Sequence, residues 1–352
     1  MLVATTSYAA DDVRKDAATR LTQERERVVN LLPQLRDLEK TKSKDVEVQV
    51  GLAILYREYD GSEDHAQRLN AQYARVLELD PNNKVIWQMR AIDAWGRPFR
   101  TRMHLVDDLE MLISNAKSRG VGRIYIRTPS PTYEPNSTNR FTVSLYDVFG
   151  DRSGRSIPIE EKDYDQARAK ARQRVNSEFE LAVNEVKEAG KHDPQNAYYD
   201  YLTAELWFNR GEPDRAVQDL EVAVRKPFIQ RYLDQKEKAV AKALEATGAP
   251  PDLYSYTDHR NSVGNYVRES IWAKHVKPLI TKMEGDSDFD QAKEICRLSV
   301  GIAKQIREEP LPDDSSNKKA VSEGIERWAN ERSAAIEKRK ADPSRSPENT
   351  PQ

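Results

Sequence analysis

The chain has 352 residues, with 56 lysines and arginines against 58 aspartates and glutamates and a formal net charge of −2. This balance argues against a dedicated nucleic-acid-binding protein, whose binding domain is usually strongly basic. Charged residues make up 32% and apolar residues 38%, proportions that favour long solvated helices over a thick sheet core. No apolar run reaches the roughly 18 residues of a membrane-spanning helix. The single cysteine, Cys296, excludes a disulfide framework within one chain.

Residues 1–10 resemble the end of a secretory signal peptide. Small residues at Ser7 and Ala9 precede the acidic Asp11 and Asp12, as they do around a signal-peptide cleavage site. The basic start and most of the apolar stretch of such a peptide are missing. We therefore expect an extracytoplasmic protein, periplasmic or secreted, over the alternative of a cytoplasmic protein with a frayed N-terminus.

Residues 11–118 have the pattern of an N-terminal helix followed by helical pairs. Along the first helix, apolar residues alternate at spacings of four and three, which predicts a seam that packs within the chain. The next helix carries Ala53-x-x-Tyr56, and its partner carries Leu69-x-x-x-Tyr73 and ends before Pro81. A further helix opens with Trp87 and Ala91, and we expect its partner helix to run from about Phe99 to Ser118.

Residues 161–247 repeat this pattern of paired helices, and they do so more completely than any other part of the chain. A long charged helix ends before Pro194 and is followed by Ala204-x-x-Trp207, by Gly211 at a turn, and by Ala216-x-x-x-Leu220. Glycine suits the turn between two helices, and Pro213 is a good first residue for the second.

These patterns resemble the tetratricopeptide repeat, whose signature is W-x₂-L-G-x₂-Y, then A-x₃-F, then P. The resemblance covers Val46–Ser118 and Val175–Val224, under half of the chain. It implies a mainly α fold, a tetratricopeptide-like array of helical hairpins (an α-solenoid), and it implies binding of a partner protein or peptide along the concave face. A non-repeat helical bundle of similar composition is the alternative.

The helix that carries Ala204 and Trp207 also has a stripe of large side chains on a different face. Large aromatic residues beside polar ones are typical anchors in a peptide-binding groove. We therefore expect the stripe to bind the partner, and the alternative is that its tyrosines pack under the next helical pair. The stripe consists of Tyr198, Tyr201, Glu205, Phe208 and Asn209.

Residues 119–160 break the helical period and predict a β-hairpin insert. Ile124 and Ile126 alternate with polar residues, as do Phe141, Val143 and Leu145, which favours two half-buried strands. The segment holds six arginines, at 119, 123, 127, 140, 152 and 155, against three acidic residues from 119 to 158. This excess indicates either a docking surface for an acidic partner or simply solvated strand faces.

Residues 252–340 predict further helices, and residues 341–352 a disordered tail. A hairpin is expected from helices near Val263–Met283 and Phe289–Glu308, capped by a final helix with Val321, Ile325, Trp328 and Ile336 on one side. The tail holds three prolines and no large apolar residue, so burial cannot offset the entropy of ordering it.

The sequence lacks the catalytic and metal-binding motifs that a search for an enzyme would look for. Its five histidines never fall at positions i and i+4, and Asp286, Asp288 and Asp290 are followed by residues unsuited to a calcium loop. Cys296 lies on an expected buried helix face, so we expect an inert thiol. We therefore predict no catalytic residue, no cofactor and no metal site.

The function that these observations favour is a non-enzymatic scaffold that binds another protein or peptide, without nucleic acid and without a membrane span. Two alternatives stay open: a structural subunit of an extracytoplasmic complex, and a hydrolase built on a helical solenoid.

Overall fold

The computed structural model describes residues 23, 26–60, 65–126, 145–149, 157–253, 271–308 and 315–341. Within these residues the chain is mainly helical, with one small antiparallel pair of strands, so the predicted helical class and β-hairpin are confirmed. The expected signal-peptide remnant at 1–10, all but the first residue of the tail, and the start of the helix near Val263 lie outside the described residues. No helix in the described part is long and apolar enough to cross a membrane.

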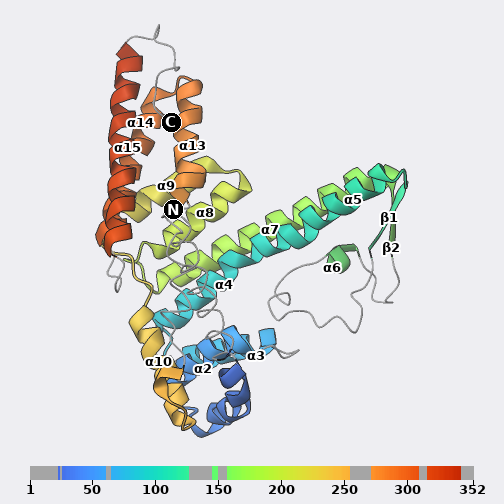
Figure 1. The fold of residues 1–352 in the computed structure, drawn as a ribbon, viewed down its shortest axis with the longest axis vertical. Helices are drawn as coiled ribbons and strands as arrows, with labels where there is room; N and C mark the ends of the chain where they lie inside the picture. Colours follow the sequence, from blue (N-terminus) through green and yellow to red (C-terminus); the bar gives the residue numbers. More distant parts are fainter. Residues whose placement is uncertain are drawn as a thin grey trace, which may run out of the picture.

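The most prominent feature is a long helical hairpin that projects from the rest of the molecule (Figure 1). Its outgoing side is formed by α4 (Lys84–Arg102), η1 (Met103–Asp107) and α5 (Asp108–Ser118), which follow one another without a break. At 1.5 Å per residue this side is about 50 Å long. The returning side is α7 (Tyr164–Lys191), and the two strands β1 (Arg123–Ile126) and β2 (Ile157–Glu160) close the tip. We call this hairpin the arm.

The contacts within the arm follow one antiparallel register from root to tip. Trp87 stacks on His192, the Arg97 side chain pairs with Glu178, Arg168 donates to Glu110, and Arg123 lies opposite Glu160. Between the helices runs a buried apolar seam, made by Leu105, Leu109, Ile113 and Ala116 from one side and by Tyr164, Ala167, Ala171 and Val175 from the other. The arm is therefore held together mainly by its own two helices.

The expected helix pair made of a Trp87 helix and a Phe99–Ser118 helix is wrong, because these residues form one continuous helix. Gly96 and Pro98 are the only breaking residues in the region, and both are buried in the helix. The irregularity is confined to η1, a single π-helical turn, which is a common way for a helix to absorb an extra residue. Packing against α7 then outweighs the local preference for a turn.

The second strand of the hairpin also differs from the expectation. The partner of β1 is β2, with Ile124 opposite Ile159 and Ile126 opposite Ile157. Leu145 belongs instead to a short helix, α6 (Leu145–Phe149), while Phe141 and Val143 lie outside the described residues. Both Ile124 and Ile126 are buried, as the alternation predicts, and Tyr125 between them is exposed.

An N-terminal core is built from the helix over residues 26–41, α2 (Val46–Tyr59), α3 (His65–Leu79), the first turns of α4, and α10 (Leu233–Ala246). Val28, Leu35 and Leu38 are buried in it, so the first seam packs within the chain as predicted. Because α10 packs against α2, far from it in sequence, the helices do not follow one another as in a linear array of repeats. The expected segment 161–247 is accordingly divided between two cores.

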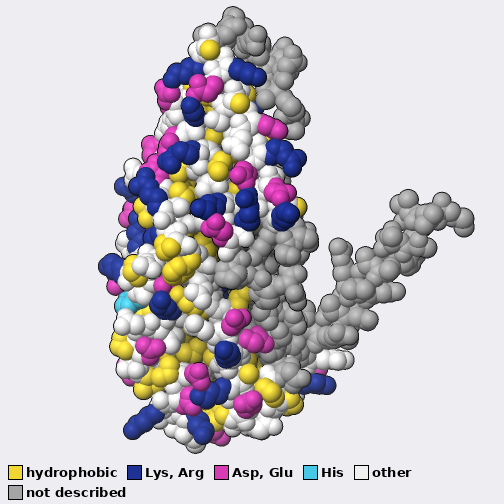
Figure 2. Space-filling model, turned by 90° about the vertical axis from the view of Figure 1, so that its left-hand side faces the viewer, with side chains coloured by type: hydrophobic (Ala, Val, Ile, Leu, Met, Phe, Trp, Pro, Cys, Tyr) yellow, Lys and Arg dark blue, Asp and Glu magenta, His cyan; other side chains and the backbone are white. Residues whose placement is uncertain are grey.

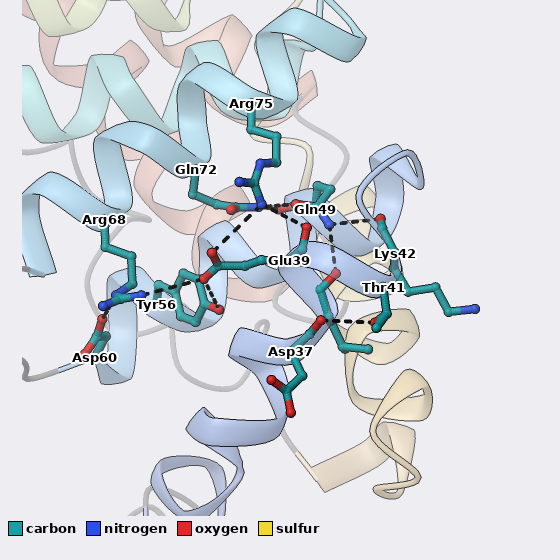
Figure 3. A network of polar contacts seen from close by, with 11 residues as sticks. Asp37, Glu39, Thr41, Lys42, Gln49, Tyr56, Asp60, Arg68, Gln72 and Arg75 are labelled. Carbon is teal, nitrogen blue, oxygen red and sulfur yellow. Dashed lines mark hydrogen bonds and ion pairs between the residues drawn. The ribbon is translucent and has the colours of Figure 1, made fainter.

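A polar network ties the first helix to α2 and α3 (Figure 3). Glu39 accepts a hydrogen bond from the Tyr56 hydroxyl at 2.7 Å and lies 3.8 Å from Arg68 and 3.9 Å from Arg75. The buried Gln72 amide donates to both the backbone and the side-chain oxygen of Gln49, each at 2.9 Å. Since buried polar groups are costly without partners, these contacts fix how the three helices meet.

The second core holds the arm, α8 (Tyr198–Arg210), α9 (Pro213–Arg225) and the C-terminal helices. The predicted α8–α9 hairpin is confirmed, with Gly211 at φ +86° in the turn, a conformation that glycine adopts without strain. Behind it lie η5 (Trp272–Val276), α13 (Lys277–Gly285), α14 (Phe289–Glu308) and α15 (Ser315–Ala341). Short 3₁₀ turns at Glu161–Asp163 and Pro251–Leu253 complete the elements.

A buried polar junction joins the two cores. Asp193, just after α7, accepts hydrogen bonds from the Tyr232 hydroxyl and from Asn196 and pairs with Lys84 at 3.1 Å. Tyr232 directly precedes α10 and has a φ of +55°, which is unfavourable for a large side chain. We conclude that the hydroxyl contact with Asp193 helps to hold the chain in this strained turn as it passes from one core to the other.

Replacement of Gly51 by alanine tests the packing of α10 on α2. A Cβ at Gly51 would lie 2.1 Å from the Ala239 carbonyl oxygen, so the two helices must separate to accommodate it. We predict a loss of about 1–3 kcal/mol in the free energy of unfolding, as for other overpacked cores, measured by urea denaturation. The matched control is Gly324→Ala in α15, where a Cβ has no neighbour within 4 Å; it should be neutral or stabilise the protein. Equal effects of the two substitutions would contradict the close approach.

Candidate functional site

The predicted partner-binding stripe is covered by other parts of the chain. Tyr201 is only 1% exposed, Tyr198 and Glu205 are buried, and Phe208 and Asn209 are half-buried. The Tyr201 hydroxyl donates a 2.6 Å hydrogen bond to the Gln305 side chain of α14. The expectation of an open groove lined by these residues is therefore corrected: the stripe packs under a neighbouring helical element, as the alternative interpretation held.

The outer end of the stripe contacts η5. The Phe208 ring stacks on the His275 ring at 4.9 Å with an interplanar angle of 3°. The Asn209 amide donates to the Glu205 carbonyl at 2.8 Å, and its nitrogen lies 3.5 Å from His275 Nε2. Burial, together with the nearby Lys274 charge, lowers the pKa of His275 below its usual value. A neutral imidazole stacked on Phe208 is what this environment favours.

Glu205 links the stripe to the root of the arm. Its Oε2 atom accepts a 3.1 Å hydrogen bond from the Trp95 indole of α4. Burial raises the pKa of Glu205 to about 7, although Lys274 and the Trp95 hydrogen bond act in the opposite direction. The carboxyl group therefore changes its charge near neutral pH, at the point where α4, α8 and the C-terminal helices meet.

Three further side chains that the sequence singles out are buried or have structural partners. Burial raises the pKa of the Cys296 thiol to about 11, so little of the nucleophilic thiolate is present at neutral pH. Asp288 accepts from the Gln291 backbone at the start of α14, and Asp290 pairs with Lys340. No group of three or more acidic, histidine or cysteine side chains in these residues could hold a metal ion.

The arm carries most of the large apolar side chains that are left exposed. Eight such side chains occur in the described residues, and five of them lie on the arm. We call these five the arm surface: Met103, Met111, Val121, Tyr125 and Leu181. None of these residues was singled out from the sequence; Met103 and Met111 fall in an expected helix pair that does not form. One feature of the sequence could have indicated an exposed apolar residue: Met111 lies outside the apolar seam made by Leu109 and Ile113.

In the outer part of the arm the charges are divided between the two helices. From Met103 to Ala116 the outgoing helix has three acidic residues and no lysine or arginine, whereas α7 has four basic residues from Arg168 to Arg174. Glu110 and Arg168 join the two sides through hydrogen bonds of 2.9 to 3.1 Å. Of the six arginines that predicted a basic insert, only Arg119 and Arg123 are in the described residues. By contrast, the face shown in Figure 2 has basic and acidic side chains interspersed along its length.

Comparisons with known proteins give no relative: no protein-family model, no curated protein and no solved structure matches the chain. The assignment of a function therefore rests on the residues and their geometry alone.

Replacement of Glu205 by glutamine tests the buried carboxyl group. The pKa of Glu205 is about 7 in the folded protein and near 4.3 in the unfolded chain. Between these two pH values the folded protein binds more protons than the unfolded chain. The contribution of Glu205 therefore makes the folded protein less stable as the pH rises from about 4.3 to about 7. We predict that Glu205→Gln, which keeps an oxygen for Trp95, is more stable than wild type at pH 8 by up to about 3 kcal/mol. The difference should shrink toward zero at pH 4.5.

Urea denaturation at several pH values measures this effect, with the exposed Glu331→Gln as a control that should leave the profile unchanged. The same pH profile for wild type and Glu205→Gln would show that this carboxyl group titrates normally.

Proposed function

We propose that this protein is a non-enzymatic interaction scaffold that binds a partner protein through the arm. The observation that carries the proposal is the concentration of exposed apolar side chains there, five of the eight in the described residues. Scattered exposed apolar residues are ordinary, but their concentration on one feature marks an interaction site. The arm projects from the rest of the molecule (Figure 1).

The architecture of the arm supports this function. A pair of helices buries the residues of one seam and exposes its outer faces to the solvent. Such a pair therefore presents a long surface to a partner although it buries few residues. Methionine is well suited to such a surface, because its flexible side chain adapts to different partners. Met103 and Met111 lie about two turns apart on the outgoing side of the arm.

The proposal moves the partner contact from the stripe on α8 to the arm and keeps the rest of the expected role. The likeness to tetratricopeptide repeats at α2–α3 and α8–α9 remains part of it, as a statement about these two helical pairs alone. An extracytoplasmic location is also retained, and it rests only on the sequence of residues 1–10. If the partner stays bound throughout purification, the protein is a permanent subunit of a complex.

Photo-crosslinking in the organism of origin tests the proposal. A crosslinking amino acid placed at Met111 or Leu181 should capture the same partner protein, identified by mass spectrometry. The control position is Val222 in α9, which is exposed to a similar degree, 47% against 55% and 49%, but lies outside the arm. Capture of a partner at Val222 and not at the two arm positions would contradict the proposal.

Charge placed on the arm surface gives a quantitative prediction once a partner is known. Met111→Asp combined with Leu181→Asp should weaken binding at least tenfold, because each burial of an apolar anchor contributes about 1–2 kcal/mol. Both positions are exposed, so the melting temperature should stay close to that of wild type. Val222→Asp should leave the affinity unchanged, and a loss of binding equal to that of the double variant would contradict the assignment.

A further inference from the structure

Three arginines lie near one another where the arm meets the N-terminal core. Arg57 comes from the last turn of α2, and Arg97 and Arg100 come from α4. Asp93, one turn before Arg97 on α4, is the acidic residue that binds Arg57 and acts on the charge of Arg100. This arrangement is independent of the arm surface, which begins at Met103.

Both oxygens of Asp93 already accept hydrogen bonds from other groups. Its Oδ1 atom accepts from Arg57 Nε at 2.7 Å, and its Oδ2 atom accepts from the Tyr73 hydroxyl at 2.8 Å. Arg97 pairs with two residues of α7, with Glu178 at 3.3 Å and with Glu185 at 2.7 Å. The cluster therefore has acidic partners for two of its three guanidinium groups.

Arg100 is the guanidinium that remains. It forms no hydrogen bond or ion pair with any residue in the described ranges, and its Nε atom is buried without an acceptor. The group lies back along its own helix over Gly96, where a Cβ would be 2.7 Å from one of its terminal nitrogens. A side chain at position 96 would therefore require the Arg100 guanidinium to shift.

The surroundings of Arg100 disfavour its positive charge. Burial lowers the pKa of the guanidinium; Asp93 opposes this shift, whereas Arg57 and Arg97 add to it. A buried charge without a partner is costly, and proteins usually supply one. Arg100 as a whole is only half-buried, which leaves a small ion access from the solvent.

We propose that Arg100 forms the centre of an oxyanion-binding site that takes one carboxylate or phosphate group, with Arg57 as the second cationic wall. A guanidinium presents parallel N–H donors that match the two oxygens of such a group, which suits it better than a halide. The oxyanion can be a free ion or the end of an acidic side chain. Bound there, it bridges α4 and α2 and so strengthens the attachment of the arm to the N-terminal core.

Calorimetric titration of the full chain with inorganic phosphate, in a chloride buffer free of other oxyanions, tests the proposal. Wild type should bind one phosphate per chain, and Arg100→Gln should weaken binding at least tenfold. The matched control is Arg102→Gln, an exposed arginine of the same helix, which should bind as wild type does. No saturable binding to wild type, or equal binding to Arg100→Gln, would overturn the proposal.

Thermal unfolding separates a binding role from a purely structural one. Without phosphate, Arg100→Gln should melt at or above the wild-type temperature, because it removes an unpaired charge; with phosphate, only proteins that keep Arg100 should gain stability. A lower melting temperature for Arg100→Gln without phosphate, together with no phosphate effect on wild type, would make Arg100 structural and overturn the site.

A parallel titration with N-acetylglutamate distinguishes the two sources of the oxyanion. Tighter binding than phosphate indicates an acidic side chain, and weaker binding indicates a free phosphate.

Discussion

The packing of α4, η1 and α5 on α7 is the interaction on which the rest of the molecule depends. The first turns of α4 contribute Val85, Ile86 and Met89 to the N-terminal core, and from Ala91 onward the same helix belongs to the second core. At its other end, α7 leads directly into Asp193 and α8. One helix pair thus builds the arm and joins the two cores, so a change in its register would move every other element.

The polar groups of interest gather at the root of this helix pair. Within two turns of α4, Trp95 donates to the buried Glu205 and Arg100 lies unpaired beside Arg57 and Asp93. Both Glu205 and Arg100 are ionisable groups in surroundings that disfavour their charge. The root therefore combines a large apolar contact area with charges whose cost depends on pH or on a bound ion. The tip and outer faces of the arm, by contrast, are where apolar side chains are left exposed.

The parts of the fold that the sequence predicts correctly are those set by local signals. Gly211 and Pro213 define the turn between α8 and α9, and both confirm the expected hairpin. The alternation at Ile124 and Ile126 predicts a strand, and the helical position of Cys296 predicts its burial; both are found. These signals act within a few residues, where propensity and periodicity are informative.

The parts that fail depend on partners far away in sequence. Gly96 and Pro98 favour a turn locally, but α7 provides a long apolar surface that keeps the helix continuous. The stripe on α8 has the same spacing whether it lines a groove or lies under other helices. The residues that contact it lie far along the chain: Gln305, 104 residues beyond Tyr201, and His275, which stacks on Phe208. The partner of β1 is β2, at the far end of the insert and about 30 residues after the end of β1. None of these contacts can be read from the periodicity of the neighbouring sequence.

The continuity of the outgoing helix is the central claim, and a distance across it is the most direct test. Spin labels at the exposed positions Arg90 and Ser114, in a Cys296→Ser background, can be measured by double electron–electron resonance. One continuous helix places these positions about 36 Å apart, at 1.5 Å per residue. A helical hairpin with a turn near Pro98 would bring them within about 20 Å. A single narrow distribution near the longer distance supports the arm, and a dominant population at the shorter distance contradicts it.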